Sequence, residues 1–238
     1  MASISGDFAT SLVSHYKLEE ASGNRADELG TNLLTETGGT IVNAAAIQAN
    51  GADFESANSD YLYNSAPSGL TSLTSYSVSF WYKPESTGTQ GLVGLTTTND
   101  AEIKFQFFLI TSKIYFRRNK TGGTLIDVIG ATTLSAGTWY HITGTFSTTN
   151  GMVLYVNAAS DGTSTDTTAT VSATRTLSIG ARRRAASHDI FTDGVLDEIS
   201  IWDGRELTSS EVSSIYNAGA GIPYAAAAST FRPRVIQY

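Results

Sequence analysis

Short runs of alternating apolar and polar residues, separated by Gly, Ser, Thr and Asn, recur along nearly the whole of this 238-residue chain. The clearest run is 76–83 (YSVSFWYK), in which Val78, Phe80 and Tyr82 fall on one face of an extended strand. The run 139–146 (WYHITGTF) repeats the pattern. Because a period of two marks strands with one buried face, the sequence predicts an all-β sandwich or barrel.

The composition agrees with a folded β domain and excludes several classes of partner and site. Hydrophobic residues make up 41% of the chain, which is enough for a core. The net charge of −7 argues against nucleic acids and anionic membranes, which require a basic surface. The absence of cysteine excludes disulfides and cysteine-bound zinc. The sequence has neither a secretory signal pattern at its start nor an apolar stretch of about 20 residues that could span a membrane.

One helix is expected near the C-terminus. The segment 207–211 (LTSSE) offers a Thr or Ser as N-cap with Glu211 two or three residues later, close to a capping box, in which the two side chains satisfy backbone amides of the first turn. Val212 and Ile215 follow at helical spacing, and 217–219 (NAG) supplies a stop. The spacing predicts a helix of about ten residues.

The chain divides into one large domain with two short ends. We expect an N-terminal extension at 1–10, a single domain at 11–222, and a linker with a C-terminal tail at 223–238. The tail is low-complexity and then basic and partly apolar. Two interpretations are open, an idle terminus or a peptide that docks onto another structural protein.

Five motifs follow one another in an order that indicates a family. The first is 14–24 (SHYKLEEASGN), and the last is 194–202 (GVLDEISIW), just before the expected helix. Between them lie 50–54 (NGADF), 77–81 (SVSFW) and 139–142 (WYHI). The ordered set, covering roughly residues 10–220, resembles the laminin-G-like (pentraxin-type) domains of the concanavalin A-like lectin/glucanase superfamily. The resemblance implies a jelly roll of two stacked antiparallel sheets.

The resemblance also implies a range of functions. Domains of this family bind glycans, proteins or each other, many carry a structural calcium, and many occur in phage and marine microbial adhesins and virions. We therefore expect a non-catalytic, lectin-like module that recognises a host glycan, located on a virion or at the extracellular surface. A purely structural protein that decorates a capsid or tail through its terminal peptides is the alternative, and self-association fits either function.

Aromatic residues on the non-core faces of the expected strands are the candidates for sugar binding. Trp81 and Trp139 lie opposite the core positions of their strands, together with His141. Tyr115 and Arg117 share a face on the central hairpin. If these faces are open, the five side chains line a glycan platform, and burial under a loop or a neighbouring subunit is the alternative.

Calcium is the cofactor that the carboxylates favour. The loop at 22–31 offers Asp27, and Asp197 begins the last long strand. The resemblance places this first loop beside the last strand, so the two carboxylates could share a Ca²⁺ ion, which prefers several oxygen ligands. Ordinary loop and strand-end charges are the alternative.

An enzyme is not expected. Glycoside hydrolysis needs two carboxylates that face each other, and the adjacent Asp197 and Glu198 would point to opposite faces of a regular strand. The chain contains three histidines and no G-x-S-x-G nucleophile motif. A glycoside hydrolase is therefore the third and least favoured hypothesis.

Two short basic clusters stand out from the acidic chain. They are 117–120 (RRNK) and 182–184 (RRR). Solvated loop charge is one interpretation. Contact with an acidic partner or an anionic glycan is the other.

Overall fold

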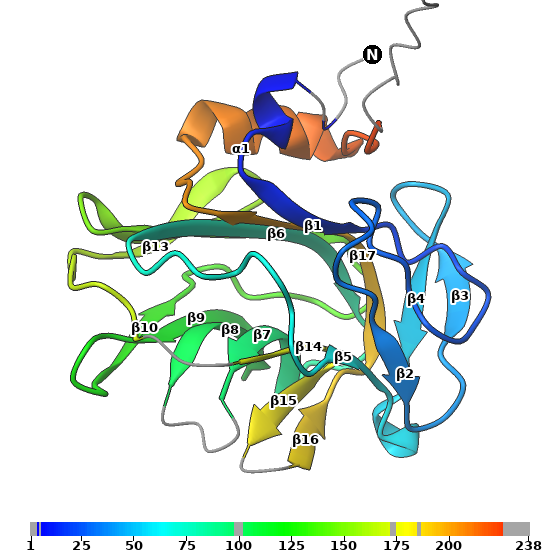
Figure 1. Ribbon diagram of the computed structural model, residues 1–238. Coiled ribbons are helices and arrows are strands. Elements are labelled where there is room, and N and C mark those ends of the chain that lie inside the picture. The colour runs from blue at the N-terminus through cyan, green and yellow to red at the C-terminus, as the bar shows by residue number, and fades with distance from the viewer. Residues whose placement is uncertain (1–3, 5, 98–101, 172–174, 185–186, 226–238) are drawn as a thin grey trace, which may run out of the picture.

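The computed structural model describes residues 4, 6–97, 102–171, 175–184 and 187–225, and it is a sandwich of two antiparallel sheets (Figure 1). One sheet has eight strands, namely β13 (Ala159–Ser164), β12 (Gly151–Val156), β11 (Tyr140–Ser147), β6 (Ser75–Pro84), β17 (Gly194–Asp203), β4 (Asn50–Phe54) and β3 (Val42–Ala45) in this order, with β1 (Leu12–Tyr16) paired to β17. The other has seven, namely β10 (Leu125–Ile129), β9 (Lys113–Asn119), β8 (Ile103–Ile110), β7 (Gln90–Thr96), β14 (Thr176–Ile179), β5 (Tyr61–Asn64) and β2 (Thr35–Thr37).

The remaining elements are a hairpin and short helices outside the two sheets. They are β15 (Ala181–Arg184), β16 (Ser187–Phe191), α1 (Ser209–Tyr216) and the 3₁₀ turns η1 (Gly6–Ala9), η2 (Ser56–Asn58) and η3 (Asn217–Gly219). The all-β fold predicted from the periodicity and the two stacked antiparallel sheets implied by the resemblance are both confirmed.

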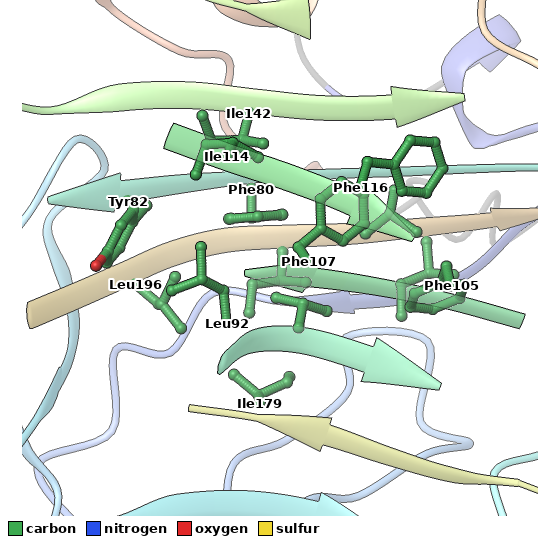
Figure 2. Packing of buried hydrophobic residues seen from close by; sticks show 14 of the residues in the cluster. Phe80, Tyr82, Leu92, Phe105, Phe107, Ile114, Phe116, Ile142, Ile179 and Leu196 are labelled. Carbon is green, nitrogen blue, oxygen red and sulfur yellow. The ribbon is translucent and has the colours of Figure 1, made fainter. Parts of the chain in front are cut away.

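The main core fills the space between the sheets. Alternate residues of each long strand point inward, and Figure 2 shows Phe80 and Ile142 from one sheet packed against Phe107 and Phe116 from the other. The rings of Phe107 and Phe116 are stacked, with centroids 4.7 Å apart. Burial of large apolar side chains at this density is the main source of stability in such a sandwich.

Helix α1 covers the outer face of the eight-stranded sheet (Figure 1). It begins at the expected capping box, since Glu211 N donates to Thr208 Oγ1 and Thr208 N donates to Glu211 Oε2. Its buried face, Val212 and Ile215, packs with Trp202 of β17 in a second hydrophobic cluster. The predicted C-terminal helix is confirmed, with eight residues and Asn217 in the left-handed conformation at its end.

Both chain ends contribute to this second cluster. Ile4 is 2% exposed, and its N–H donates to Pro223 O at 3.0 Å. The indole Nε1 of Trp202 donates to Phe8 O at 2.6 Å. Residues in the expected 1–10 extension and at the start of the expected 223–238 linker are thus packed on the domain. The proposed docking tail falls on 226–238, outside the described residues.

Strand β17 contains a bulge that the sequence did not indicate. The pairing with β6 shifts register between Asp197 and Ser200, and Glu198 adopts a φ of +51°. Leu196 and Ile199 both face the main core, so two residues instead of one lie between them. The expectation that Asp197 and Glu198 point to opposite faces is therefore wrong, because the bulge turns both carboxylates away from the core.

Candidate functional site

The seven-stranded sheet leaves its outer face without a helix among the described residues (Figure 1). A cluster of aromatic rings lies on this face, and we call it the aromatic platform: Tyr61, Tyr63, His188 and Phe191. The ring of Tyr61 lies 4.0 Å from that of His188, 5.8 Å from that of Tyr63 and 6.2 Å from that of Phe191, measured between centroids. All four side chains are partly exposed, so flat apolar surface is accessible there.

The aromatic platform is built by a strand and by the hairpin that folds over the sheet. Tyr61 and Tyr63 flank Leu62, which is buried in the core, so the two tyrosines point outward together. The hairpin is held to β7 by a hydrogen bond from Thr192 Oγ1 to Gly91 O at 2.7 Å. A side chain at Gly91 would collide with Arg182 N, so glycine permits this approach.

His188 is fixed within the platform by one hydrogen bond. Its Nε2 lies 2.9 Å from Ser178 Oγ, on the adjacent strand β14. Burial, together with the positive charge of the nearby Arg183, lowers the pKa of His188 to about 4. The imidazole is therefore neutral at physiological pH and offers a flat, uncharged ring.

A row of paired residues extends from the platform across the same face. Tyr63 pairs with Ser178, Ser178 with Gly94, Gly94 with Gln106, and Gln106 with Arg117. Gln106 is buried, and its Nε2 has no hydrogen-bond acceptor among the described residues. Gly94 is itself buried, and the side chain of Gln106 lies over it, since a Cβ at this position would lie 3.2 Å from Gln106 Cγ.

Tyr115 and Arg117, two of the five sequence candidates, lie at the far end of this face. Both are half-buried on β9. Arg117 makes two hydrogen bonds with Asp127, at 2.7 and 2.8 Å, and its guanidinium lies over the ring of Phe108. Arg117 is thus already engaged with a carboxylate of its own chain.

Trp81 and His141, two further candidates, are buried beneath helix α1. Trp81 is 3% exposed, and its ring stacks on Tyr216 of the helix with centroids 5.7 Å apart. His141 is 1% exposed, bonds Ser79 Oγ through Nε2 at 2.7 Å, and has a pKa lowered by burial to about 3. The platform expected on an open face here does not exist, because the helix covers it.

Trp139, the fifth candidate, is partly exposed just before β11. Lys83 Nζ lies 5.5 Å from the centroid of its ring. This indole belongs to the eight-stranded sheet, whereas Tyr115 and Arg117 belong to the other. The five candidates therefore lie on different faces of the molecule and cannot form one site.

Asp27 and Asp197, the predicted calcium ligands, each accept backbone hydrogen bonds. Asp27 accepts from the amides of His15, Leu29 and Asn32 at 3.0–3.2 Å. Asp197 Oδ2 accepts from Ile47 and Gln48, both at 3.0 Å, and its Oδ1 is buried without a donor. Calcium at these two residues stays a prediction.

A buried polar network surrounds the bulge. His15 Nδ1 lies 2.8 Å from Ser200 Oγ, and His15 Nε2 lies 3.2 Å from Glu198 Oε2. The ring of Tyr224 stacks on His15 at 4.7 Å. Serine, histidine and glutamate occur together in catalytic triads, but these three side chains are at most 6% exposed and Tyr224 covers the imidazole. The network is as inaccessible to solvent as the structural interior of the domain.

A group of three carboxylates lies at the end of the eight-stranded sheet. The oxygens of Asp53, Glu55 and Glu85 all lie within 4.8 Å of one another. Desolvation raises the pKa of each, and repulsion from Asp53 adds to the upward pKa shifts of Glu55 and Glu85. This is the arrangement among the described residues that could hold a cation, and neither Asp27 nor Asp197 belongs to it.

Only half of the aromatic platform could be predicted from the sequence. The alternation of Tyr61 and Tyr63 around Leu62 was a usable signal for two outward tyrosines. The contribution of His188 and Phe191 depends on how the hairpin folds back over β7 and β14. Contacts between residues more than 100 positions apart leave no local pattern.

The Laminin_G_3 family model, described as the concanavalin A-like lectin/glucanases superfamily, matches residues 56–213. No curated protein matches the chain. Of the described part of the chain, no helix is both long and apolar enough to cross a membrane.

Several solved structures share the fold at low sequence identity. Domain 4 of AbnA, an extracellular arabinanase from Geobacillus stearothermophilus solved with arabinotriose, has a TM-score of 0.65 at 22% identity, and the match covers 86% of this chain and 97% of that domain. The binding domain of Paraclostridial Mosquitocidal Protein 1 has a TM-score of 0.69 at 18% identity, over 88% of this chain and 52% of that one. The receptor binding domain of botulinum neurotoxin D has a TM-score of 0.65 at 16% identity, over 88% and 53%.

The chain therefore spans about half the length of the two toxin binding domains and nearly all of the arabinanase domain. These likenesses concern the fold. Because the family model covers most of the sequence and the fold agrees with it, the chain belongs to the concanavalin A-like lectin/glucanase superfamily.

Proposed function

We propose that this chain is a carbohydrate-binding module that holds a glycan on the outer face of its seven-stranded sheet. The main observation that supports this proposal is the aromatic platform of partly exposed rings. The platform continues into the paired row of polar side chains. Aromatic faces suit the apolar faces of sugar rings, and a few convergent polar groups fix orientation. The arabinotriose complex of the arabinanase domain supports a glycan as the ligand class.

A glycan array with the purified chain and two variants tests this proposal. Tyr63→Ala removes a platform ring, and Trp139→Ala removes a partly exposed ring from the other sheet. We expect a specific signal that Tyr63→Ala weakens by about tenfold or more and that Trp139→Ala leaves intact. Loss with Trp139→Ala alone would move the site to the eight-stranded sheet, and a blank array with the folded protein would contradict the proposal.

The same array addresses calcium and catalysis. Running it in calcium and again in chelator shows whether binding depends on an ion, and Asp197→Asn tests the predicted ligand. The proposal assigns no catalytic step to the chain. Release of shortened glycans, abolished by Glu85→Gln, would instead indicate hydrolysis at the three carboxylates, whose spacing approaches the roughly 5 Å of retaining glycosidases.

The setting in which the module works is a separate part of the proposal. We infer that it displays the glycan site at a virion or extracellular surface, and the structural alternative assigns assembly to the C-terminal tail. Deleting 226–238 distinguishes the two. Loss of assembly with intact glycan binding would support the tail as a structural contact.

A further inference from the structure

The three consecutive arginines of hairpin β15–β16 differ in their partners. Arg182 makes two hydrogen bonds with Asp189, at 2.7 and 2.6 Å. Arg183 makes no hydrogen bond or ion pair within the described part of the chain, and its Nε is buried without an acceptor. The Arg183 side chain is partly exposed, so the rest of its guanidinium is available to an acceptor supplied from outside the chain.

The pairing of the hairpin sets the direction of Arg183. It lies directly opposite His188, so the two side chains leave the hairpin on the same face. His188 stacks on Tyr61 and bonds Ser178, so this face of the hairpin is the one directed toward Tyr61 of the aromatic platform. Arg184 pairs with Ser187 and points to the opposite face of the hairpin.

A second unpartnered donor lies on the same sheet face. The buried Nε2 of Gln106 has no acceptor in the described chain. Gln106 is separated from Ser178 by Gly94 of the intervening strand, which corresponds to about 10 Å at the usual strand spacing. Arg183 and Gln106 therefore each carry one buried donor without an acceptor within the described part of the chain.

We infer that the ligand of this face is an acidic glycan, whose carboxylate or sulfate group binds Arg183 while a sugar ring packs on Tyr61 and Tyr63. This inference rests on the proposed carbohydrate-binding function. Guanidinium matches both groups in geometry and charge. Because the chain carries a net charge of −7, its overall field opposes an anion, and recognition depends on short-range contact with this arginine.

Calorimetry with matched glycan pairs tests the inference. The probes are sialyllactose with lactose, oligogalacturonate with its methyl ester, and sulfated with unsulfated lactose. We expect one acidic member to bind about tenfold or more tightly than its neutral partner. Arg183→Gln should reduce that affinity to the neutral level, Arg183→Lys should retain part of it, and the control Arg184→Gln should retain all of it.

The outcomes separate the acidic ligand class from the glycan function. If a neutral glycan binds as tightly as its acidic partner and Tyr63→Ala abolishes that binding, the binding face stands and the acidic class is wrong. If an acidic glycan binds better but Arg183→Gln, still folded by circular dichroism, keeps the preference, the assignment to Arg183 is wrong. If none of the probes binds and a broad array is also blank, the proposed function itself fails.

Discussion

Two adjacent carboxyl groups, Asp197 and Glu198, lie buried at the bulge of β17, and His15 lies 3.2 Å from Glu198. Burial raises the pKa of each carboxyl group to about 8, and it lowers the pKa of His15 to about 4 and that of His141 to about 3. Such groups bind protons differently in the folded and unfolded chain, so they make the free energy of unfolding depend on pH.

The pH dependence has a definite sign. Between about pH 4 and 8 the folded carboxyl groups retain protons that the unfolded chain has released, so their contribution to stability falls as pH rises. The histidines act in the opposite sense, because below pH 6.5 the unfolded chain holds protons that the folded chain lacks. The two trends oppose each other below pH 6.5, and of these four groups only the carboxyl groups still act between pH 6.5 and 8.

We therefore expect the free energy of unfolding to decrease by roughly 2–4 kcal/mol from pH 6.5 to pH 8. Denaturant titrations at several pH values measure it. The double variant Asp197→Asn, Glu198→Gln should flatten the profile in this interval. A free energy that rises over the same interval in the unmodified chain would contradict the assignment.

Trp81 and Tyr63 provide a second test at the level of single residues. Trp81 is enclosed by Tyr216 and His141, so Trp81→Ala should cost about 3–5 kcal/mol of stability. Tyr63 is partly exposed, so Tyr63→Ala should cost about 1 kcal/mol or less while weakening glycan binding. Thermal melts of both variants measure the loss of stability, and the glycan array measures the loss of binding. Together they show whether Trp81 contributes to stability and Tyr63 to binding.

At the level of elements, helix α1 depends on its first turn. The capping box between Thr208 and Glu211 satisfies amides that would otherwise lack partners. Thr208→Ala should lower the free energy of unfolding by about 1 kcal/mol, whereas the exposed Ser210→Ala within the helix should be neutral or slightly stabilising. Equal effects of the two substitutions, measured by denaturant unfolding, would show that the cap contributes nothing.

The elements also show how far local patterns predict this molecule. Strands β6 and β11 were predictable because their inward residues recur at a period of two, and helix α1 because its cap and its apolar spacing are both local. The bulge in β17 was not, since an extra residue is defined by register with neighbouring strands. The covering of Trp81 was equally hidden, because the helix that buries it lies more than 100 residues away in sequence.

At the level of the whole molecule, the N-terminal residues act as part of the domain. Ile4 is buried in the second cluster, whereas Ile129 is 51% exposed on the edge strand β10. Ile4→Ala should therefore cost about 2–4 kcal/mol and Ile129→Ala less than about 0.5 kcal/mol. Comparable melting temperatures for the two variants would mean that the N-terminal segment is not held as described.

The candidate site could be predicted only in part at this scale. The sequence identified Tyr115 and Arg117 on the open sheet face, and it raised an anionic glycan as one interpretation of 182–184. It also grouped them with Trp81, Trp139 and His141, which belong to the other sheet. Assigning a strand to one sheet or the other requires the pairing of segments far apart in the chain, and alternation within a strand carries no such information.

An isolated β-bridge between Ile4 and Tyr224 joins the two ends of the described domain. The chain enters and leaves the packed domain side by side, next to helix α1, while the aromatic platform lies on the opposite side of the sandwich (Figure 1). Ile4 and Tyr224 therefore lie at the same pole of the sandwich. A carrier attached at that pole would leave the aromatic platform, the glycan site proposed above, on the side of the domain that faces away from the carrier.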